Sequence, residues 1–200
     1  MEKWYVMRTV PGKEQEAGAL MERTIDKSLW SQWRVLKKQK LFRAKGKLLL
    51  SMETMFPGYI FVKSSLPKEL EEELNKSREY PKLIGNESIE TVPVEEQDLR
   101  FLQAVCGKEL EKPMSLSRVE ADEKGKLIHV DGILKKYEGQ IIRQRLRKRY
   151  VLAEVELFQR KENVLFGIYL PGDEIWRESR IVVEKHKSIN EEKEAKITCL

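Results

Sequence analysis

The first part of the chain alternates short apolar runs with segments of helical spacing. Residues 4–10 are apolar and rich in β-forming residues, and the run ends at Pro11-Gly12. The next segment places apolar residues three and four positions apart, which predicts an amphipathic helix after the turn. Its apolar positions are Ala17, Leu20, Met21, Thr24, Ile25 and Leu29.

The pattern continues with a hairpin, a buried strand and two further helices. Residues 33–43 and 48–52 are extended runs joined by Ala44-Lys45-Gly46-Lys47, which predicts a hairpin projecting from a sheet. Residues 56–62 read Phe-Pro-Gly-Tyr-Ile-Phe-Val, a rigid turn followed by an apolar run typical of a central strand. Leucines at 66, 70 and 74 predict a helix, residues 80–85 a strand, and residues 93–105 a helix. We therefore predict one compact α+β domain over residues 1–107.

The second part has short strands and no helical pattern. Residues 108–114 are polar and aperiodic, which predicts a linker. Five short strands follow, with Gly132 and Gly139 bounding one of the turns. The strands are expected at residues 116–119, 126–130, 140–143, 150–158 and 163–170. This spacing predicts a small all-β barrel over residues 115–170, with a charged tail over residues 171–200 in which residues 181–183 are β-like.

Composition and motifs argue against an enzyme, a metal protein or a membrane protein. Cys106 and Cys199 form no CxxC pair and have no histidine at ligand spacing, so no disulfide and no metal site are expected. His129 and His186 are the only histidines, and no nucleophile or nucleotide-binding motif is present. No apolar run approaches the roughly 20 residues that span a bilayer. We expect a soluble, cytoplasmic protein without catalysis or cofactor.

Charge along the chain is uneven although the net charge is only +5. Residues 1–50 carry +7, residues 51–125 carry −6 and residues 126–150 carry +6. Five cations fall within seven residues at the tip of a predicted β-hairpin, and two lysines lie in the preceding turn. They are Arg143, Arg145, Arg147, Lys148 and Arg149, with Lys135 and Lys136. Because unpaired like charges repel, this cluster favours binding of a polyanion such as RNA, whereas the spread cations of residues 1–50 favour solvated faces.

Aromatic residues beside turns leave two interpretations open. Tyr137, between the two glycines, is equally compatible with packing in the barrel and with stacking on a base. Trp4, Tyr5, Phe56, Pro57 and Tyr59 lie close to turns on two segments expected to be neighbours in one sheet. Spacing alone favours a core position for this set, and a docking surface for another protein is the alternative.

Two motifs together resemble a known family. Trp4-Tyr5-Val6 with Pro11-Gly12-Lys13-Glu14, and Met55 through Val62, resemble the N-terminal (NGN) domain of NusG-type transcription elongation factors. Residues 130–141 resemble a KOW motif. The resemblance covers residues 1–170. It implies an α+β NGN domain that binds the clamp helices of bacterial RNA polymerase, followed by an SH3-like KOW barrel that contacts RNA or other factors.

The resemblance also implies roles for particular residues. It moves the aromatic set Trp4, Tyr5, Phe56, Pro57 and Tyr59 from core towards a polymerase-binding pocket. The cationic turn and the sequence Asp131-Gly132-Ile133-Leu134-Lys135 are closer to the specialised LoaP paralogues, which are antiterminators that recognise a leader RNA hairpin. We therefore expect a monomeric antiterminator that binds polymerase and nascent RNA. The alternatives are a general NusG that couples transcription to termination or translation, and a KOW-containing ribosome-associated protein.

Overall fold

The computed structural model describes residues 1–84 and 91–177, which form two compact units. Unit 1 comprises Met1–Lys38, Glu53–Met114 and Val155–Glu162. Unit 2 comprises Gln39–Met52, Ser115–Glu154 and Asn163–Leu200, the last described to residue 177. The predicted domain boundaries at residues 107 and 115 stay a prediction. The β-like run at residues 181–183 lies outside the described residues.

A four-stranded antiparallel sheet forms the centre of unit 1, in the order β2-β5-β1-β6. Its strands are β1 (Lys3–Arg8), β2 (Gln32–Arg34), β5 (Tyr59–Ser64) and β6 (Lys82–Leu83). The predicted central strand is confirmed, because β5 pairs on both sides and Ile60, Phe61 and Val62 are fully buried. An unbroken apolar run suits a strand that is covered on both faces.

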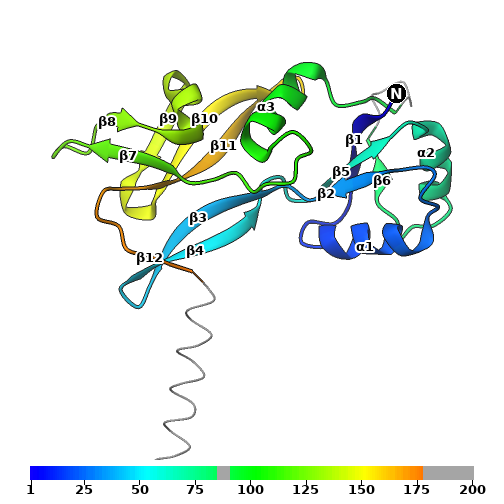
Figure 1. The fold of residues 1–200 in the computed structure, drawn as a ribbon, viewed down its shortest axis with the longest axis horizontal. Coiled ribbons are helices and arrows are strands. Elements are labelled where there is room, and N and C mark those ends of the chain that lie inside the picture. Colours follow the sequence, from blue (N-terminus) through cyan, green and yellow to red (C-terminus); the bar gives the residue numbers. More distant parts are fainter. Residues whose placement is uncertain (85–90, 178–200) are drawn as a thin grey trace, which may run out of the picture. The chain divides into compact units, whose positions relative to one another are not determined.

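Three helices occur in unit 1 where the apolar spacing predicts them. They are α1 (Glu14–Thr24), α2 (Pro67–Asn75) and α3 (Glu96–Cys106). α1 and α2 lie against one face of the sheet (Figure 1). Their buried side chains, among them Met21 of α1 and Leu70 and Leu74 of α2, join Tyr5 and Met7 of β1 in one core. None of the helices in the described residues has the length and apolar character that crossing a bilayer requires.

The predicted hairpin is also present. β3 (Lys37–Ala44) and β4 (Lys47–Thr54) pair in a three-stranded sheet of order β12-β4-β3 (Figure 1). The third strand, β12 (Ile175–Arg177), pairs with β4 in parallel, with Ile175 opposite Leu48. The sequence prediction assigned these residues to the charged tail, so their place in a sheet is a correction.

The second part of the chain forms a five-stranded sheet in the order β8-β7-β11-β10-β9. Its strands are β7 (Ser117–Ala121), β8 (Leu127–Val130), β9 (Ile141–Arg145), β10 (Tyr150–Leu157) and β11 (Arg160–Tyr169). All five lie within a few residues of their predicted positions. No helical pattern was predicted in this part, and the structure adds short 3₁₀ segments at Gly132–Gln140 (η1), which is interrupted by a kink at Tyr137, and at Leu146–Lys148 (η2). Such tight turns are common connectors between strands.

Candidate nucleic-acid and polymerase interfaces

Trp4 and Tyr5 lie inside the fold. Their exposed fractions are 4% and 6%, and Tyr5 belongs to the core of unit 1. Burial raises the pKa of the Tyr5 phenol. The two side chains follow each other along β1, so they point to opposite faces of the sheet. The core interpretation that spacing favours agrees with these positions, and a polymerase-binding role for the two residues stays a prediction that their burial does not favour.

Phe56, Pro57 and Tyr59 lie at the turn that leads into β5. Pro57 is exposed, whereas Phe56 and Tyr59 are partly buried. The Phe56 ring lies 6.2 Å from that of Phe61, between ring centroids. These three residues of the predicted set therefore present atoms on the surface of unit 1 from one turn.

A buried carboxylate that sequence reasoning missed holds this turn. Glu14, 4% exposed, accepts hydrogen bonds from the backbone N–H of Gly58 at 2.7 Å and of Gly12 at 2.9 Å. Burial alone would raise its pKa, but these backbone donors and the charge of Lys37 outweigh burial and lower it. Gly58 has a φ of +86°, and a Cβ there would lie 3.1 Å from the Thr9 carbonyl oxygen. Glu14 thus ties the two Pro-Gly turns together.

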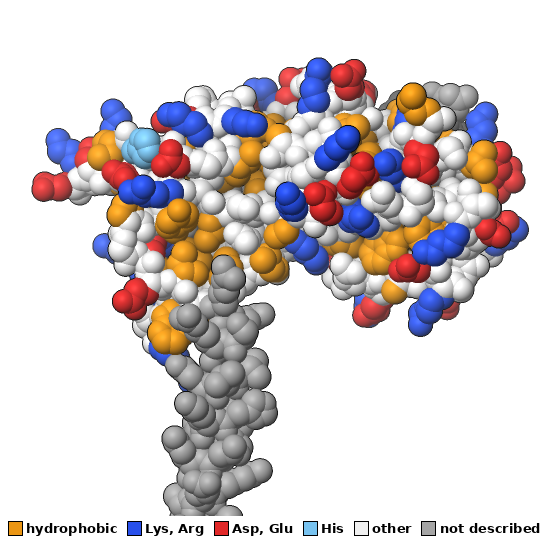
Figure 2. Space-filling model, viewed as in Figure 1, with side chains coloured by type: hydrophobic (Ala, Val, Ile, Leu, Met, Phe, Trp, Pro, Cys, Tyr) orange, Lys and Arg blue, Asp and Glu red, His pale blue; other side chains and the backbone are white. Residues whose placement is uncertain are grey.

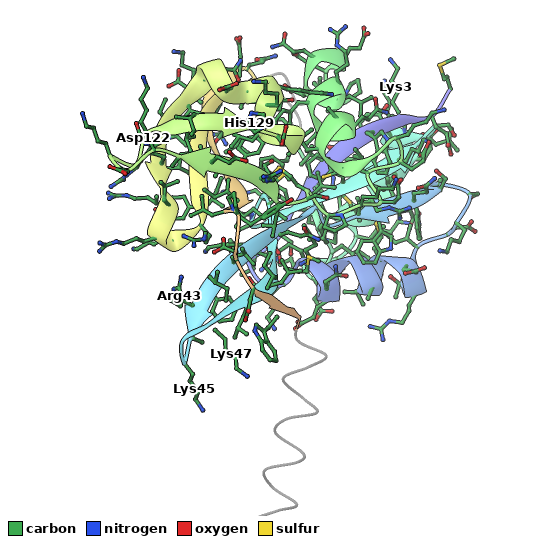
Figure 3. The ribbon with its side chains drawn as sticks, turned by 60° about the vertical axis from the view of Figure 1, so that its left-hand side comes forward. Lys3, Arg43, Lys45, Lys47, Asp122 and His129 are labelled. Carbon is green, nitrogen blue, oxygen red and sulfur yellow. The ribbon has the colours of Figure 1, made fainter. Side chains whose placement is uncertain are left out.

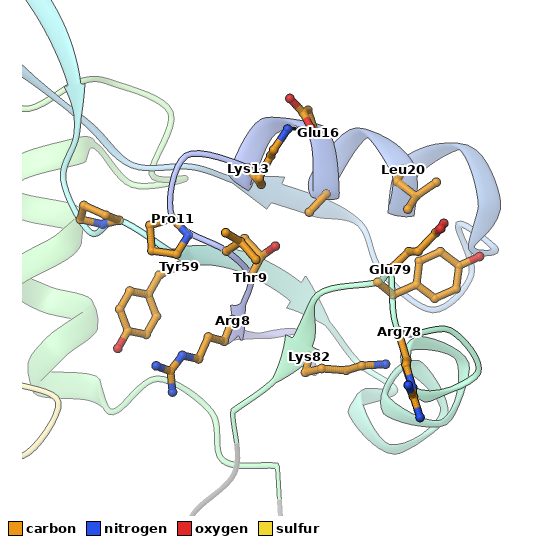
Figure 4. Close-up of a pocket in the computed structure, with 15 residues that line it drawn as sticks. Arg8, Thr9, Pro11, Lys13, Glu16, Leu20, Tyr59, Arg78, Glu79 and Lys82 are labelled. Carbon is orange, nitrogen blue, oxygen red and sulfur yellow. Dashed lines mark hydrogen bonds and ion pairs between the residues drawn. The ribbon is translucent and has the colours of Figure 1, made fainter.

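The same turn borders a groove of about 830 Å³ on unit 1 (Figure 4). Tyr59 and Tyr80 line it together with prolines from both turns. Its cations are Arg8, Lys13, Arg78 and Lys82, and its acids are Glu16 and Glu79. Lys13 pairs with Glu16 at 2.8 Å. The groove therefore offers both aromatic and cationic side chains beside the exposed Pro57.

Phe56 also contacts the ring of Phe158, which lies in a turn with a strained backbone. The Phe158 ring packs edge-on against the Phe56 ring, with 5.6 Å between centroids. Phe158 and Gln159 form the turn between β10 and β11 with φ values of +54° and +60°, a conformation that side chains other than glycine's disfavour. The Phe158 N–H donates to the Asp98 carboxylate at 3.0 Å. Burial is the main reason that the pKa of Asp98 is raised.

The cationic turn is largely exposed, as predicted. Arg143 and Arg145 lie on β9, Arg147 and Lys148 lie in η2, and all four are exposed. Within the described part of the chain, Arg145, Arg147 and Lys148 form no ion pair. Because no carboxylate pairs with these three cations, no ion pair competes with a phosphate for them.

Arg149 corrects the prediction of five unpaired cations. Its Nε and Nη2 atoms donate to the Asp173 carboxylate at 2.7 and 2.5 Å, and Nη1 donates to the Leu146 carbonyl. The two side chains are only 10% and 7% exposed. Burial alone would raise the pKa of Asp173, but the Arg149 hydrogen bond, the Leu170 N–H and the charges of Arg149 and Arg43 lower it. Arg149 therefore closes the turn, and an RNA-binding role for it stays a prediction that its burial does not favour.

The lysines of the preceding turn differ from each other. Lys135 pairs with Glu138 at 2.8 Å, and Lys136 is exposed. Between them and the second glycine, the Tyr137 ring lies 5.5 Å from that of Phe166, and burial raises the pKa of its phenol. Of the two interpretations left open for Tyr137, the structure supports packing inside unit 2. Six residues of the predicted RNA-binding set are exposed, namely Lys135, Lys136, Arg143, Arg145, Arg147 and Lys148, and Lys135 among them is paired with Glu138.

The described residues include one histidine, His129, and one cysteine, Cys106. His129, labelled in Figure 3, is half exposed and lies 2.9 Å from the Asp131 carboxylate. Cys106 is buried, and burial raises the pKa of its thiol to about 12. Among the described residues, no group of three or more His, Cys, Asp or Glu side chains is arranged to hold a metal ion. Cys199 and His186 lie outside the described residues.

Comparison with known proteins adds a family match over the first half of the chain. The profile of the NusG family, described as transcription termination factor NusG, matches residues 2–103. Among solved structures, the chain is similar to one described as domain interaction in Thermotoga maritima NusG. The identity is 20%, the match covers 84% of this chain and 94% of that one, and the TM-score is 0.46. No curated protein matches the chain.

Proposed function

The chain belongs to the NusG family of transcription factors, and we propose that it is an antiterminator that binds RNA polymerase and a structured nascent RNA. Factors of this family bind RNA polymerase. In this proposal, unit 1 holds the polymerase in its elongating state, and the exposed cations of unit 2 bind a hairpin in the leader transcript. Readthrough of terminators in a long operon then depends on that leader.

The observation that carries the proposal is the location of positive charge. The described residues of unit 2 contain 15 Lys and Arg and 8 Asp and Glu, a net charge of +7, whereas those of unit 1 contain 18 of each. Figure 2 shows acidic and basic side chains interspersed over the visible face of unit 1. A polyanion is therefore attracted to unit 2, where Arg145, Arg147 and Lys148 form no ion pair among the described residues.

These cations are better suited to contact the phosphates of structured RNA than to read the edges of its bases. The major groove of A-form RNA is too narrow for side chains to read, so a short basic turn contacts phosphates and responds to the shape of the hairpin. Arginine forks also bind phosphate oxygens in pairs. We therefore expect the RNA structure, more than its sequence, to determine affinity at this turn.

Polymerase docking is assigned to the turn before β5. Phe56, Pro57 and Tyr59 present aromatic and apolar atoms at the surface of unit 1, while Glu14 fixes the backbone on which they lie. Aromatic side chains on a rigid turn lose little conformational entropy when they bind, which makes them effective anchors. Trp4 and Tyr5 lie inside the fold opposite Lys63 and Val62, towards the other end of β5.

A binding experiment tests the RNA half of the proposal. Fluorescence anisotropy compares the structured leader RNA of the protein's own operon with an unstructured RNA of equal length. We expect a clear preference for the leader, and we expect Arg145→Ala/Arg147→Ala/Lys148→Ala to abolish it. Equal binding of both RNAs would favour the runner-up, a general NusG that couples transcription to termination or translation and has only nonspecific RNA affinity.

A further inference from the structure

A second group of cations lies at the end of the β3–β4 hairpin. Residues 39–52 contain four cations and no carboxylate. Arg43, Lys45 and Lys47 lie at or beside the hairpin end, and Figure 3 shows the three labelled side chains there. Arg43 and Lys45 are exposed and form no ion pair with any described residue, and the Lys47 ammonium lies 3.8 Å from the centre of the Trp176 ring.

The geometry of this end is fixed by its turn. Lys45 and Gly46 have φ values of +47° and +77°, the left-handed pair that closes a two-residue hairpin loop. β12 pairs along β4, so the hairpin is braced on one side by a third strand. Arg43 and Lys45 are therefore presented on a defined loop, which reduces the ordering cost of binding a ligand.

The hairpin belongs to the same unit as the cationic turn. The Leu116 N–H, just before β7, donates to the Gln39 side-chain oxygen at 3.1 Å. The β3 backbone also lies against β11, because a Cβ at Gly167 would be only 2.3 Å from the Gln39 carbonyl oxygen. Only glycine permits this approach. The hairpin is thus packed on the five-stranded part of unit 2.

Asp173 connects the two basic groups electrostatically. Its carboxylate binds Arg149, which closes the cationic turn, and it is also close enough to Arg43 for that charge to help lower its pKa. The segment that carries Asp173 continues directly into β12, the strand beside β4. Asp173 is already paired with Arg149, and neither Arg43 nor Lys45 forms an ion pair with it.

We propose that the end of the β3–β4 hairpin is a second RNA-binding element, so that Arg43 and Lys45 contact phosphates of the RNA that the cationic turn binds. This inference rests on the proposed function. It assigns an RNA contact to residues 39–52, which lie inside the residues 2–103 that match the NusG family profile. Phe42, 42% exposed, precedes Arg43 on β3 and therefore points to the other face of the strand, so it is not part of this phosphate contact.

The salt dependence of RNA binding tests this element. The full chain and its Arg43→Ala/Lys45→Ala variant are titrated with the leader hairpin from 50 to 400 mM salt. Each lost phosphate contact lowers the slope of log K against log salt by about 1, so we expect a slope smaller by about 2. At physiological salt this corresponds to a loss of affinity of roughly tenfold to fiftyfold.

Two control variants separate a contact from an effect on folding or net charge. Arg23→Ala/Lys68→Ala removes one arginine and one lysine that are exposed on α1 and α2 of unit 1, and we expect the wild-type slope. Arg43→Lys/Lys45→Arg keeps both charges, and we expect its slope to match that of the wild type as well. Urea unfolding of Arg43→Ala/Lys45→Ala that matches the wild type shows that its smaller slope is not caused by misfolding of the hairpin.

The binding measurements distinguish failure of the hairpin contact from failure of the proposed function. An unchanged slope for Arg43→Ala/Lys45→Ala, with loss of binding for Arg145→Ala/Arg147→Ala/Lys148→Ala, overturns the hairpin contact and leaves the proposed function standing. Failure of the wild type to distinguish the leader from unstructured RNA overturns the proposed function itself. An equal loss of slope on a DNA duplex of the same length, bound as tightly as the RNA, overturns RNA as the ligand of the hairpin end.

Discussion

Replacing Arg149 with alanine is expected to destabilise the protein by about 3–5 kcal/mol, because it breaks a buried ion pair from one side. The Arg149 and Asp173 side chains are 10% and 7% exposed, and two hydrogen bonds join them. Without the guanidinium, the Asp173 carboxylate stays buried and keeps the Leu170 N–H, at 2.7 Å, as a donor. Urea unfolding followed by circular dichroism measures the loss.

Arg145→Ala is the matched control, since it removes the same side chain from an exposed position of the same turn. We expect its free energy of unfolding to lie within about 0.5 kcal/mol of the wild type. For RNA affinity we expect the reverse, with a clear loss for Arg145→Ala and a smaller one for Arg149→Ala. If Arg149→Ala unfolds like the wild type and loses RNA affinity as Arg145→Ala does, Arg149 is an RNA ligand and the reasoning is refuted.

The pH dependence of unfolding gives a second check on this pair. The pKa of Asp173 is lowered in the folded protein, so the unfolded state binds its proton first as pH falls. The pair therefore contributes fully above the unfolded value of about 3.9, and its contribution disappears as pH falls through the folded value. The stability difference between the wild type and Arg149→Ala should narrow in that acid range. A difference that does not change there would contradict the assignment.

Three further substitutions test other parts of the account. Glu14→Gln should lower the free energy of unfolding in urea by about 1–3 kcal/mol, because a neutral amide oxygen replaces the buried carboxylate that accepts from Gly12 and Gly58. An unchanged free energy of unfolding would show that these hydrogen bonds do not stabilise the protein. Gln159→Gly should stabilise the chain by about 0.5–1 kcal/mol by relieving the left-handed backbone, and Glu95→Ala controls for the side-chain hydrogen bond that is lost with Gln159. Phe56→Ala should weaken binding to RNA polymerase by at least about tenfold in a titration, whereas Leu66→Ala, an exposed apolar residue elsewhere on unit 1, should not. Equal affinities for these two variants would remove Phe56 from the docking surface.

Local patterns predicted most of the elements. The apolar run before Val62, the leucine spacing of α2 and the short strands of unit 2 each depend on neighbours in sequence, and each element lies close to its predicted range. The 3₁₀ segment η1 was not predicted because its two glycines indicated tight turns. β12 was missed because its pairing partner, β4, lies more than 100 residues earlier in the chain.

The site residues were harder to predict, because their roles depend on contacts between distant positions. Arg149 is one of five similar cations in sequence, and only its hydrogen bonds to Asp173, 24 residues away, distinguish it. Glu14 binds Gly58 from 44 residues away, and its sequence neighbours give no sign of this. Tyr5 looked like an interface residue by resemblance, although the alternation along β1 places it in the core. The exposure of the cations in residues 143–148 was predictable, because a dense run of like charges in a turn is favoured only in solvent.

In vitro transcription across an intrinsic terminator tests the central claim most directly. Templates with and without the leader of the protein's own operon are transcribed with increasing amounts of the protein. We predict that readthrough rises only on the template that carries the leader, and that Arg145→Ala/Arg147→Ala/Lys148→Ala eliminates the increase. The same increase on both templates, or no increase on either, would contradict leader-dependent antitermination.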